Sequence, residues 1–117
     1  MNATGSALGS HVLLDLHGVA PPLLCDAAAL ERVLRDAAEA AGACVLSAHF
    51  HGFGAGMGVT GVLLLAESHI SIHTWPERSY AAVDVFMCGG TQPMVAVRLI
   101  QERLLAPRST VRECERG

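Results

Sequence analysis

One short segment, residues 66–77 with the sequence AESHISIHTWPE, gathers serine nucleophiles, imidazoles and a carboxylate on a few residues of chain. Its β-branched residues favour extended backbone, in which successive side chains alternate between the two faces of a strand. The two isoleucines then point to one face, while His69, Ser71 and His73 point to the other. The isoleucine face is typical of a protein core, and we expect the chemistry on the polar face.

Metal binding is the first chemistry that this segment suggests. His69 and His73 are four residues apart, which spans about 13 Å in a strand, whereas zinc ligands all lie about 2 Å from one ion. The two imidazoles therefore cannot share a metal in a strand, and the isoleucines and the Trp-Pro ending argue against a helix. We expect no metal site. The remaining histidines are interpreted as structural or surface residues: His11, His17, His49 and His51.

Nucleophilic chemistry offers two further hypotheses. Ser68, His73 and Asp84 supply the residue types of a hydrolase triad, but the Gly-x-Ser-x-Gly elbow that exposes such a serine is absent. Alternatively, the Ser68 hydroxyl attacks the carbonyl of Glu67 in its own backbone, while a nearby imidazole moves protons. The residues alone leave both hypotheses open, and the missing elbow weakens the first.

The same segment, followed by YAAVDVFMCGG at residues 80–90, resembles the bacterial and archaeal-type S-adenosylmethionine decarboxylase proenzymes. The resemblance extends upstream through FHGF at 50–53 to HVLLDLHG at 11–18, and downstream to the closing VRECERG, so it covers nearly the whole chain. A twelve-residue motif of this composition is far more specific than a lone glycine-rich loop.

The resemblance implies that the chain cleaves itself between Glu67 and Ser68, which gives a β chain of residues 1–67 and an α chain of residues 68–117. Ser68 becomes a pyruvoyl group, whose carbonyl forms a Schiff base with the substrate amine and accepts the electrons released as carbon dioxide departs. No metal and no pyridoxal phosphate is then needed. The implied reaction is decarboxylation of S-adenosylmethionine to the aminopropyl donor of spermidine and polyamine synthesis.

The resemblance also implies roles for the other site residues. His73 supports proton transfer during processing, and Cys88 reprotonates the product carbon. Thr60 supports processing at a position where many members of the family have serine. Phe53 stacks on adenine and Glu77 holds the ribose hydroxyls. An aromatic, acidic pocket of this kind also suits the sulfonium charge of the substrate.

Besides Thr60, this chain departs from the family pattern near the Phe-His-x-Phe stretch, and this second departure concerns the substrate. Gly52 replaces a basic residue that is often found in the Phe-His-x-Phe stretch, and the following loop is one residue longer than in some relatives. A pyruvoyl-dependent decarboxylase of ornithine or arginine on the same scaffold is therefore one alternative, and a non-processed paralogue without enzymatic activity is another. Phe53 and Glu77 favour the nucleoside substrate, and the intact serine, histidine and cysteine argue against the paralogue.

Hydrophobic periodicity predicts the elements that must position these residues. Asp26 caps one helix, which Gly42 ends, and a second helix begins near Pro93 and is stopped by Pro107. The glycine-rich segment 54–58 lacks the Lys-Ser or Lys-Thr of a phosphate loop and is interpreted as a mobile active-site loop. Short links between consecutive strands favour antiparallel pairing. The predicted strands cover residues 11–17, 43–50, 59–67, 69–75, 80–88 and 109–115.

These elements predict a single α+β domain of 117 residues, a two-layer sandwich with two helices on one face of a mainly antiparallel sheet. Strands 43–50 and 59–67 are apolar on both faces, so the face without helices needs a partner. We expect a homodimer that packs sheet on sheet, and the resemblance implies active sites near the subunit boundary. Trp75 and Tyr80 are interpreted as structural aromatic residues.

Composition excludes several other partners. The formal net charge is −3, and no basic run interleaves with aromatic residues, so we expect no nucleic-acid partner. The longest apolar run is too short to span a bilayer and no signal segment precedes it, which predicts a cytoplasmic protein without a membrane partner. The four cysteines have no Cys-x-x-Cys spacing, so we expect reduced thiols, with Cys44 packed in an apolar strand.

Overall fold

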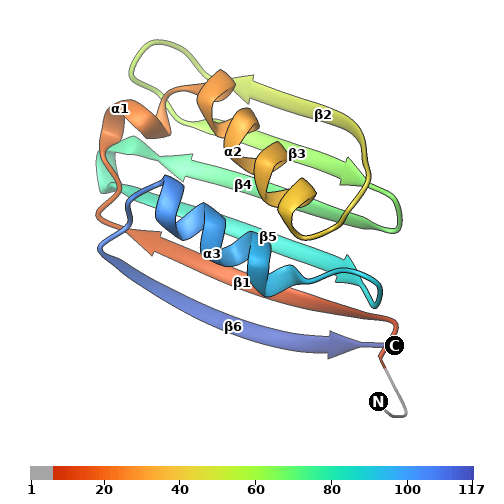
Figure 1. The fold of residues 1–117 in the computed structure, drawn as a ribbon. Helices are drawn as coiled ribbons and strands as arrows, with labels where there is room; N and C mark the ends of the chain where they lie inside the picture. The colour runs from red at the N-terminus through yellow and green to blue at the C-terminus, as the bar shows by residue number, and fades with distance from the viewer. Residues whose placement is uncertain (1–6) are drawn as a thin grey trace.

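Six antiparallel strands form one sheet in the computed structural model, which describes residues 7–117 (Figure 1). The strand order across the sheet is β2-β3-β4-β5-β1-β6, so the last strand of the chain pairs with the first at one edge. This arrangement confirms the predicted α+β fold. The strands are β1 (Gly9–His17), β2 (Val45–Gly52), β3 (Val59–Leu65), β4 (Ser68–Trp75), β5 (Tyr80–Cys88) and β6 (Arg108–Arg116).

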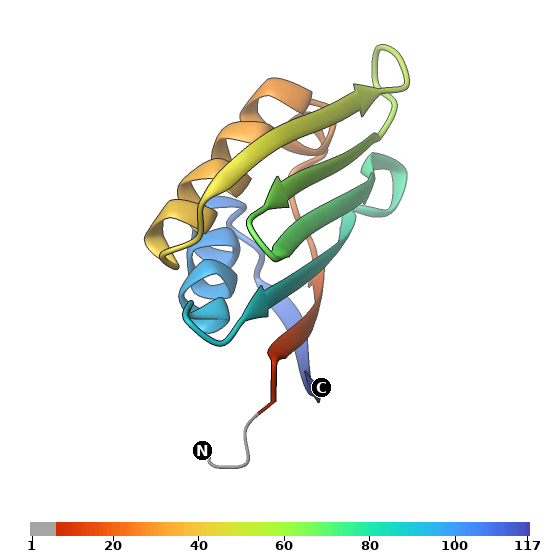
Figure 2. The same cartoon turned by 90° about the vertical axis from the view of Figure 1, so that its right-hand side faces the viewer.

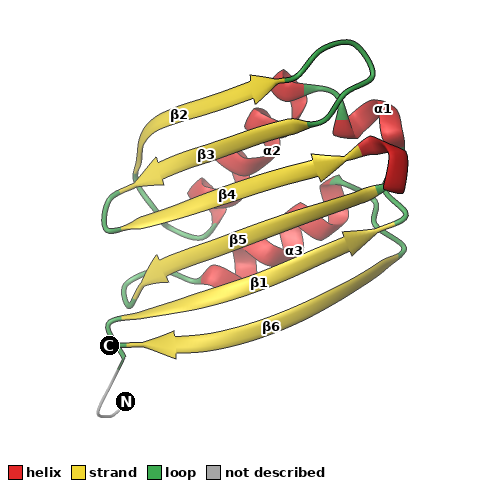
Figure 3. Ribbon diagram, turned by 180° about the vertical axis from the view of Figure 1, so that it is seen from behind, coloured by secondary structure: helices red, strands yellow, loops and turns green. Residues whose placement is uncertain are grey.

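The longer helices, α2 (Ala27–Ala40) and α3 (Pro93–Arg103), lie on the same face of the sheet, as the edge-on view in Figure 2 shows. The helix α2 begins where the sequence predicts, because the Asp26 side chain accepts a hydrogen bond from the backbone N–H of Ala29 at 3.0 Å. We call the face of the sheet that α2 and α3 cover the helix face. The opposite face carries no helix of the described residues (Figure 3), and we call it the open face.

Two short helices were not predicted from the sequence. They are α1 (Pro21–Leu24) and the 3₁₀ helix η1 (Pro76–Arg78). Each begins at a proline, which suits a first helical turn, but each is too short to show a helical repeat of apolar residues. Both lie at the same end of the sheet, at the left in Figure 1, close to the loop between β2 and β3.

The core lies between the helix face and the helices. Leu63, Ile70 and Ile72 of the central strands are fully or almost fully buried, and they pack with Leu30 and Leu34 of α2. Full burial of a side chain of this size stabilises the fold by about 1.5–3 kcal/mol. The alternation predicted for β4 is therefore confirmed, with its isoleucines inside and His69, Ser71 and His73 on the open face.

The β2 strand differs from its prediction. It begins at Val45, two residues later than predicted, and a register shift between Val45 and Ser47 leaves Leu46 61% exposed. Cys44 therefore precedes the strand and is exposed, so its predicted place in an apolar strand is wrong. An irregularity of this kind disrupts the strand ladder locally, so the regular strand begins later than its apolar sequence suggests.

Candidate active site

The peptide bond between Glu67 and Ser68 lies at a tight hairpin turn. Leu65 pairs with Ser68, so only Ala66 and Glu67 connect β3 to β4. Glu67 has a φ of 60°, in the left-handed region that non-glycine residues rarely adopt. Such a conformation costs about 1–2 kcal/mol. The chain therefore holds a strained residue immediately before the serine.

Ser68 is held at this turn by a backbone amide of the neighbouring strand. Its side chain is 7% exposed, and its Oγ accepts a hydrogen bond from the Cys88 N–H at 3.1 Å. Cys88 ends β5, and its half-buried side chain shares the open face with Phe86. We refer to Ser68 and Cys88, which carry the predicted cleavage and proton-transfer roles, as the cleavage group.

Two histidines surround the cleavage group on the open face. His11 and His69 both pair across the sheet with Phe86, and each ring centroid lies 5.9 Å from that of Phe86. The Nε2 of His11 is buried without a hydrogen-bond partner among the described residues, and it lies 3.9 Å from the Asp84 carboxylate. These imidazoles lie closer to Ser68 along the sheet than His73 does.

The second group of predicted site residues lies at the opposite end of the sheet. The Thr60 Oγ and the Nδ1 of His73 are 3.2 Å apart, on directly paired positions of β3 and β4. Beside them, the loop between β2 and β3 and the η1 turn enclose a cavity of about 410 Å³. We refer to Phe53, Thr60, His73 and Glu77 as the pocket group. The cavity is lined by Phe53, Gly56, Met57, Gly58, Val59, Thr60, His73, Thr74, Trp75 and Glu77.

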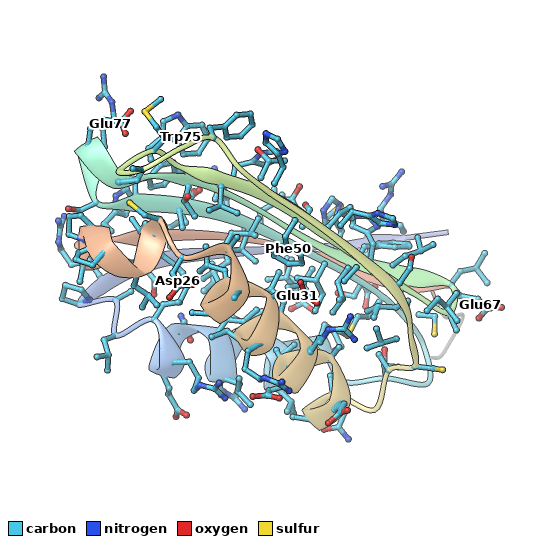
Figure 4. The ribbon with its side chains drawn as sticks, turned by 90° about the horizontal axis from the view of Figure 1, so that it is seen from above. Asp26, Glu31, Phe50, Glu67, Trp75 and Glu77 are labelled. Carbon is cyan, nitrogen blue, oxygen red and sulfur yellow. The ribbon has the colours of Figure 1, made fainter. Side chains whose placement is uncertain are left out.

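The structure keeps the two groups apart within one chain. Ser68 and His73 are five residues apart on one strand, a separation of about 16 Å at 3.3 Å for each residue. Their side chains also point to opposite faces, since Ser68 is on the helix face and His73 is on the open face. Figure 4 shows Glu67 at one end of the molecule and Trp75 and Glu77 at the other. A single chain therefore does not bring His73 to the serine that it is predicted to assist.

Two large, exposed side chains of the cavity lining were not predicted as individual site residues. Trp75 is 40% exposed and lies on the open face two residues after His73, with 6.3 Å between the ring centroids. The same alternation that singled out the histidines could have identified it. Met57 is 55% exposed and lies in the glycine-rich loop, where no periodic pattern indicates which side chains point inward. The loop forms part of the cavity, and its mobility stays a prediction.

The open face next to the cavity carries a network of ionisable groups. The Tyr80 hydroxyl donates to the Asp15 carboxylate at 2.6 Å, and Arg112 lies 3.5 Å from the same carboxylate. The hydrogen bond to Asp15, followed by burial, raises the pKa of Tyr80 from 10.0 to about 12. Tyr80 also stacks on Trp75, with 5.4 Å between the ring centroids. Tyr80 therefore stays neutral and supports a wall of the cavity.

All six histidines of the chain share the open face with this network, because the strand register places them on equivalent sides. Among residues 7–117, however, no three histidine, cysteine, aspartate or glutamate side chains gather closely enough to bind a metal ion.

No helix among residues 7–117 has the length and apolar composition to cross a membrane. The cytoplasmic location stays a prediction.

The sheet, its two groups of polar residues and its aromatic, acidic cavity define a small α+β enzyme. Over residues 10–117 the chain matches the family described as S-adenosylmethionine decarboxylase. It therefore belongs to the S-adenosylmethionine decarboxylase family.

Individual relatives agree with this assignment. The S-adenosylmethionine decarboxylase proenzyme of Thermodesulfovibrio yellowstonii is 43% identical over 112 residues, which cover 95% of this chain and 82% of that protein. That of Parasynechococcus marenigrum is 47% identical over 110 residues, which cover 93% and 85%. The crystal structure of the adenosylmethionine decarboxylase from Aquifex aeolicus matches with a TM-score of 0.89 and 38% identity, and covers 97% of this chain and 93% of that one.

Proposed function

We propose that this chain is the proenzyme of a pyruvoyl-dependent decarboxylase of S-adenosylmethionine, and that Ser68 is the source of its pyruvoyl group. One observation carries the proposal for the serine. Glu67 is strained at φ 60°, and the nucleophilic Ser68 follows it directly at a tight turn. Cleavage of the bond between them relieves this strain. Family membership supports the reaction and the substrate.

The cleavage follows from the chemistry of a serine beside its own peptide bond. The Ser68 Oγ attacks the Glu67 carbonyl carbon, and the acyl group moves from nitrogen to oxygen to form an ester. Elimination then releases the Glu67 carboxylate, and hydrolysis of the resulting enamine releases ammonia and leaves the new terminal group on residue 68. The hydrogen bond from the Cys88 N–H fixes the Ser68 side chain before attack. The residues present therefore fit the formation of the group in place.

The pyruvoyl group, once formed, supplies an electron-withdrawing carbonyl for the loss of carbon dioxide. The rest of the reaction depends on other side chains of the chain. The Cys88 thiol, two strand positions from Phe86 on the open face, returns a proton to the product carbon. Thr60 and His73, 3.2 Å apart, move protons during processing.

The cavity at the other end of the sheet is suited to a nucleoside. Its volume of about 410 Å³ lies in the range of small-molecule sites. The exposed Phe53 ring stacks on the adenine base, and the Glu77 carboxylate accepts hydrogen bonds from the ribose hydroxyls. The aromatic and acidic lining also stabilises the positive sulfonium group. Ornithine and arginine have no base or ribose, so this cavity would be largely empty with either of them.

We also propose a homodimer in which each active site is shared between two chains. When two open faces pack about a two-fold axis that lies across the strands, the end of one sheet, with the Glu67–Ser68 turn and the open-face Cys88, lies against the pocket group of the partner. This arrangement brings opposite ends of the sheets together, which one chain alone cannot do. It also covers exposed apolar residues of the open face, such as Leu13 at 36% and Leu64 at 48% exposure.

Release of labelled carbon dioxide tests the substrate assignment. Processed protein is supplied in parallel with S-adenosylmethionine, ornithine and arginine, each labelled at the carboxyl carbon, and the uncleaved Ser68→Ala chain is the control. We expect release from S-adenosylmethionine alone and none from the control. Release from ornithine or arginine only would refute the substrate and leave the pyruvoyl chemistry standing.

A further inference from the structure

Thr74 is a buried polar residue between two side chains of the cavity. Its neighbours in sequence, His73 and Trp75, point to the open face, so Thr74 points to the helix face, where it is 7% exposed. Its hydroxyl donates to the carbonyl of Leu24 at 2.7 Å and accepts from the N–H of Val59 at 2.8 Å. One hydroxyl thus connects the end of α1, the start of β3 and the end of β4.

The same residue contacts the loop that carries Phe53. Val59 directly follows this loop, and the preceding Gly58 lies so close that an added Cβ would overlap the Thr74 carbonyl oxygen. The loop closes on itself through a hydrogen bond from the Phe53 N–H to the Gly58 carbonyl at 3.0 Å. Phe53 is therefore connected to Thr74 through the base of its own loop.

The helix α1, to which Thr74 is hydrogen-bonded, lines a second cavity. A cavity of about 530 Å³ is lined by Pro21, Pro22, Cys25, Gly56, Pro76 and Glu77. It shares Gly56 and Glu77 with the proposed substrate cavity. A displacement of α1 would therefore also change the surroundings of Glu77, which is proposed to bind the ribose. The bond from Thr74 to the Leu24 carbonyl is the only side-chain hydrogen bond to α1 among the described residues.

We infer that Thr74 is a positioning residue for the substrate cavity, which holds the Phe53 loop and α1 in the arrangement that binds the nucleoside. This inference rests on the proposed function for its ligand. Without the hydroxyl, the Val59 N–H and the Leu24 carbonyl lose a buried partner, and the loop spends less time in the binding arrangement. The apparent affinity for substrate falls as fewer molecules are in the binding arrangement. Saturating substrate shifts the molecules back into that arrangement.

The effect should fall on KM rather than on kcat, because the Thr74 hydroxyl points to the helix face and bonds only to backbone groups of α1 and β3. We expect Thr74→Val to raise KM for S-adenosylmethionine about tenfold and to keep kcat per processed chain within about twofold. Thr74→Ser keeps the hydroxyl and should keep KM near that of the wild type. The matched control is Ile72→Val, which shortens a buried side chain on the same face of β4 but breaks no hydrogen bond.

A merely structural role predicts a different result, in which Thr74→Val and Ile72→Val both lower the yield of folded protein and neither changes KM. That result would overturn the inference, and so would an equal rise in KM for Thr74→Ser. If Thr74→Val does not fold, Thr74→Cys replaces it. Its thiol is a weaker hydrogen-bonding group, so KM should rise by a smaller factor, and an unchanged KM would refute the inference.

Labelling of Cys25 tests the same contact without any catalysis. This half-buried thiol follows α1 directly and lines the second cavity. Iodoacetamide labelling of Cys25 is followed by peptide mass spectrometry in full-length Ser68→Ala chains. We expect Thr74→Val to speed labelling at least about threefold over Thr74→Ser. Equal labelling rates would overturn the inference, while failure of the decarboxylase assay alone would refute only the proposed function.

Discussion

Mixing two inactive variants tests whether each site is shared between two chains. Ser68→Ala removes the nucleophile, and His73→Ala removes the imidazole that lies about 16 Å away along β4 and on the opposite face. If the partner's pocket group serves each serine, both variants alone remain uncleaved. In a mixed dimer, the intact Ser68 of one chain meets the intact His73 of the other, and one of the two sites is complete.

The expected magnitude follows from random pairing. At equal expression, about half of the dimers are mixed, and each mixed dimer has one complete site of two. Intact-mass analysis of the co-expressed, differently tagged chains should therefore find about half of the His73→Ala chains cleaved. Carbon dioxide release should reach about a quarter of the wild-type value.

Two results would refute the shared site. One is that the co-expressed His73→Ala chain stays uncleaved although mixed dimers form, as a pull-down through the second tag would reveal. The other is that His73→Ala expressed alone cleaves as fast as the wild type. In that case His69 and His11, near the cleavage group, would be the candidate imidazoles for proton transfer. Co-expression of Ser68→Ala with Ser68→Ala under both tags controls for background cleavage.

Two further predictions concern stability. Tyr80 has a pKa of about 12 in the folded chain against 10.0 for the free side chain, so the folded state binds more protons between these values and loses stability as pH rises through them. The free energy of unfolding can be measured by urea at about pH 9 and about pH 11 for Ser68→Ala chains with and without Tyr80→Phe. It should fall less between the two pH values when Tyr80 is phenylalanine, and equal falls would contradict the assigned hydrogen bond. At Gly61, an added Cβ would overlap the Phe50 ring, so Gly61→Ala should cost about 1–3 kcal/mol. Gly52→Ala, with open space around it, should stay within about 0.5 kcal/mol in the same denaturation assay, and equal effects would refute the packing argument.

Much of the fold could be predicted because its longer elements follow simple repeats. The period of two in β4 identified which of its faces is buried, and Asp26 indicated the start of α2. The short elements α1 and η1 escaped prediction, since three or four residues cannot display a repeat. The irregular start of β2 escaped for a related reason, because the register shift depends on pairing with β3 rather than on local sequence.

The site was predictable as a set of residues but not as an arrangement. Spacing along one strand already implied that Ser68 and His73 lie far apart, yet only the sheet register assigns Ser68 and Cys88 to one end and Phe53, Thr60 and Glu77 to the other. Thr74 carried no sequence signal, because its role depends on contacts with α1 and β3, which are distant in the chain.

The mass spectrum of purified, native protein tests the central claim most directly. The account predicts two chains, residues 1–67 and residues 68–117, the second with a blocked terminus and lighter than a serine-headed chain by the mass of one ammonia. Ser68→Ala should give a single full-length chain under the same conditions. A wild-type spectrum with only the uncleaved chain, or with a serine-headed fragment, would contradict the claim that Ser68 becomes the reactive carbonyl.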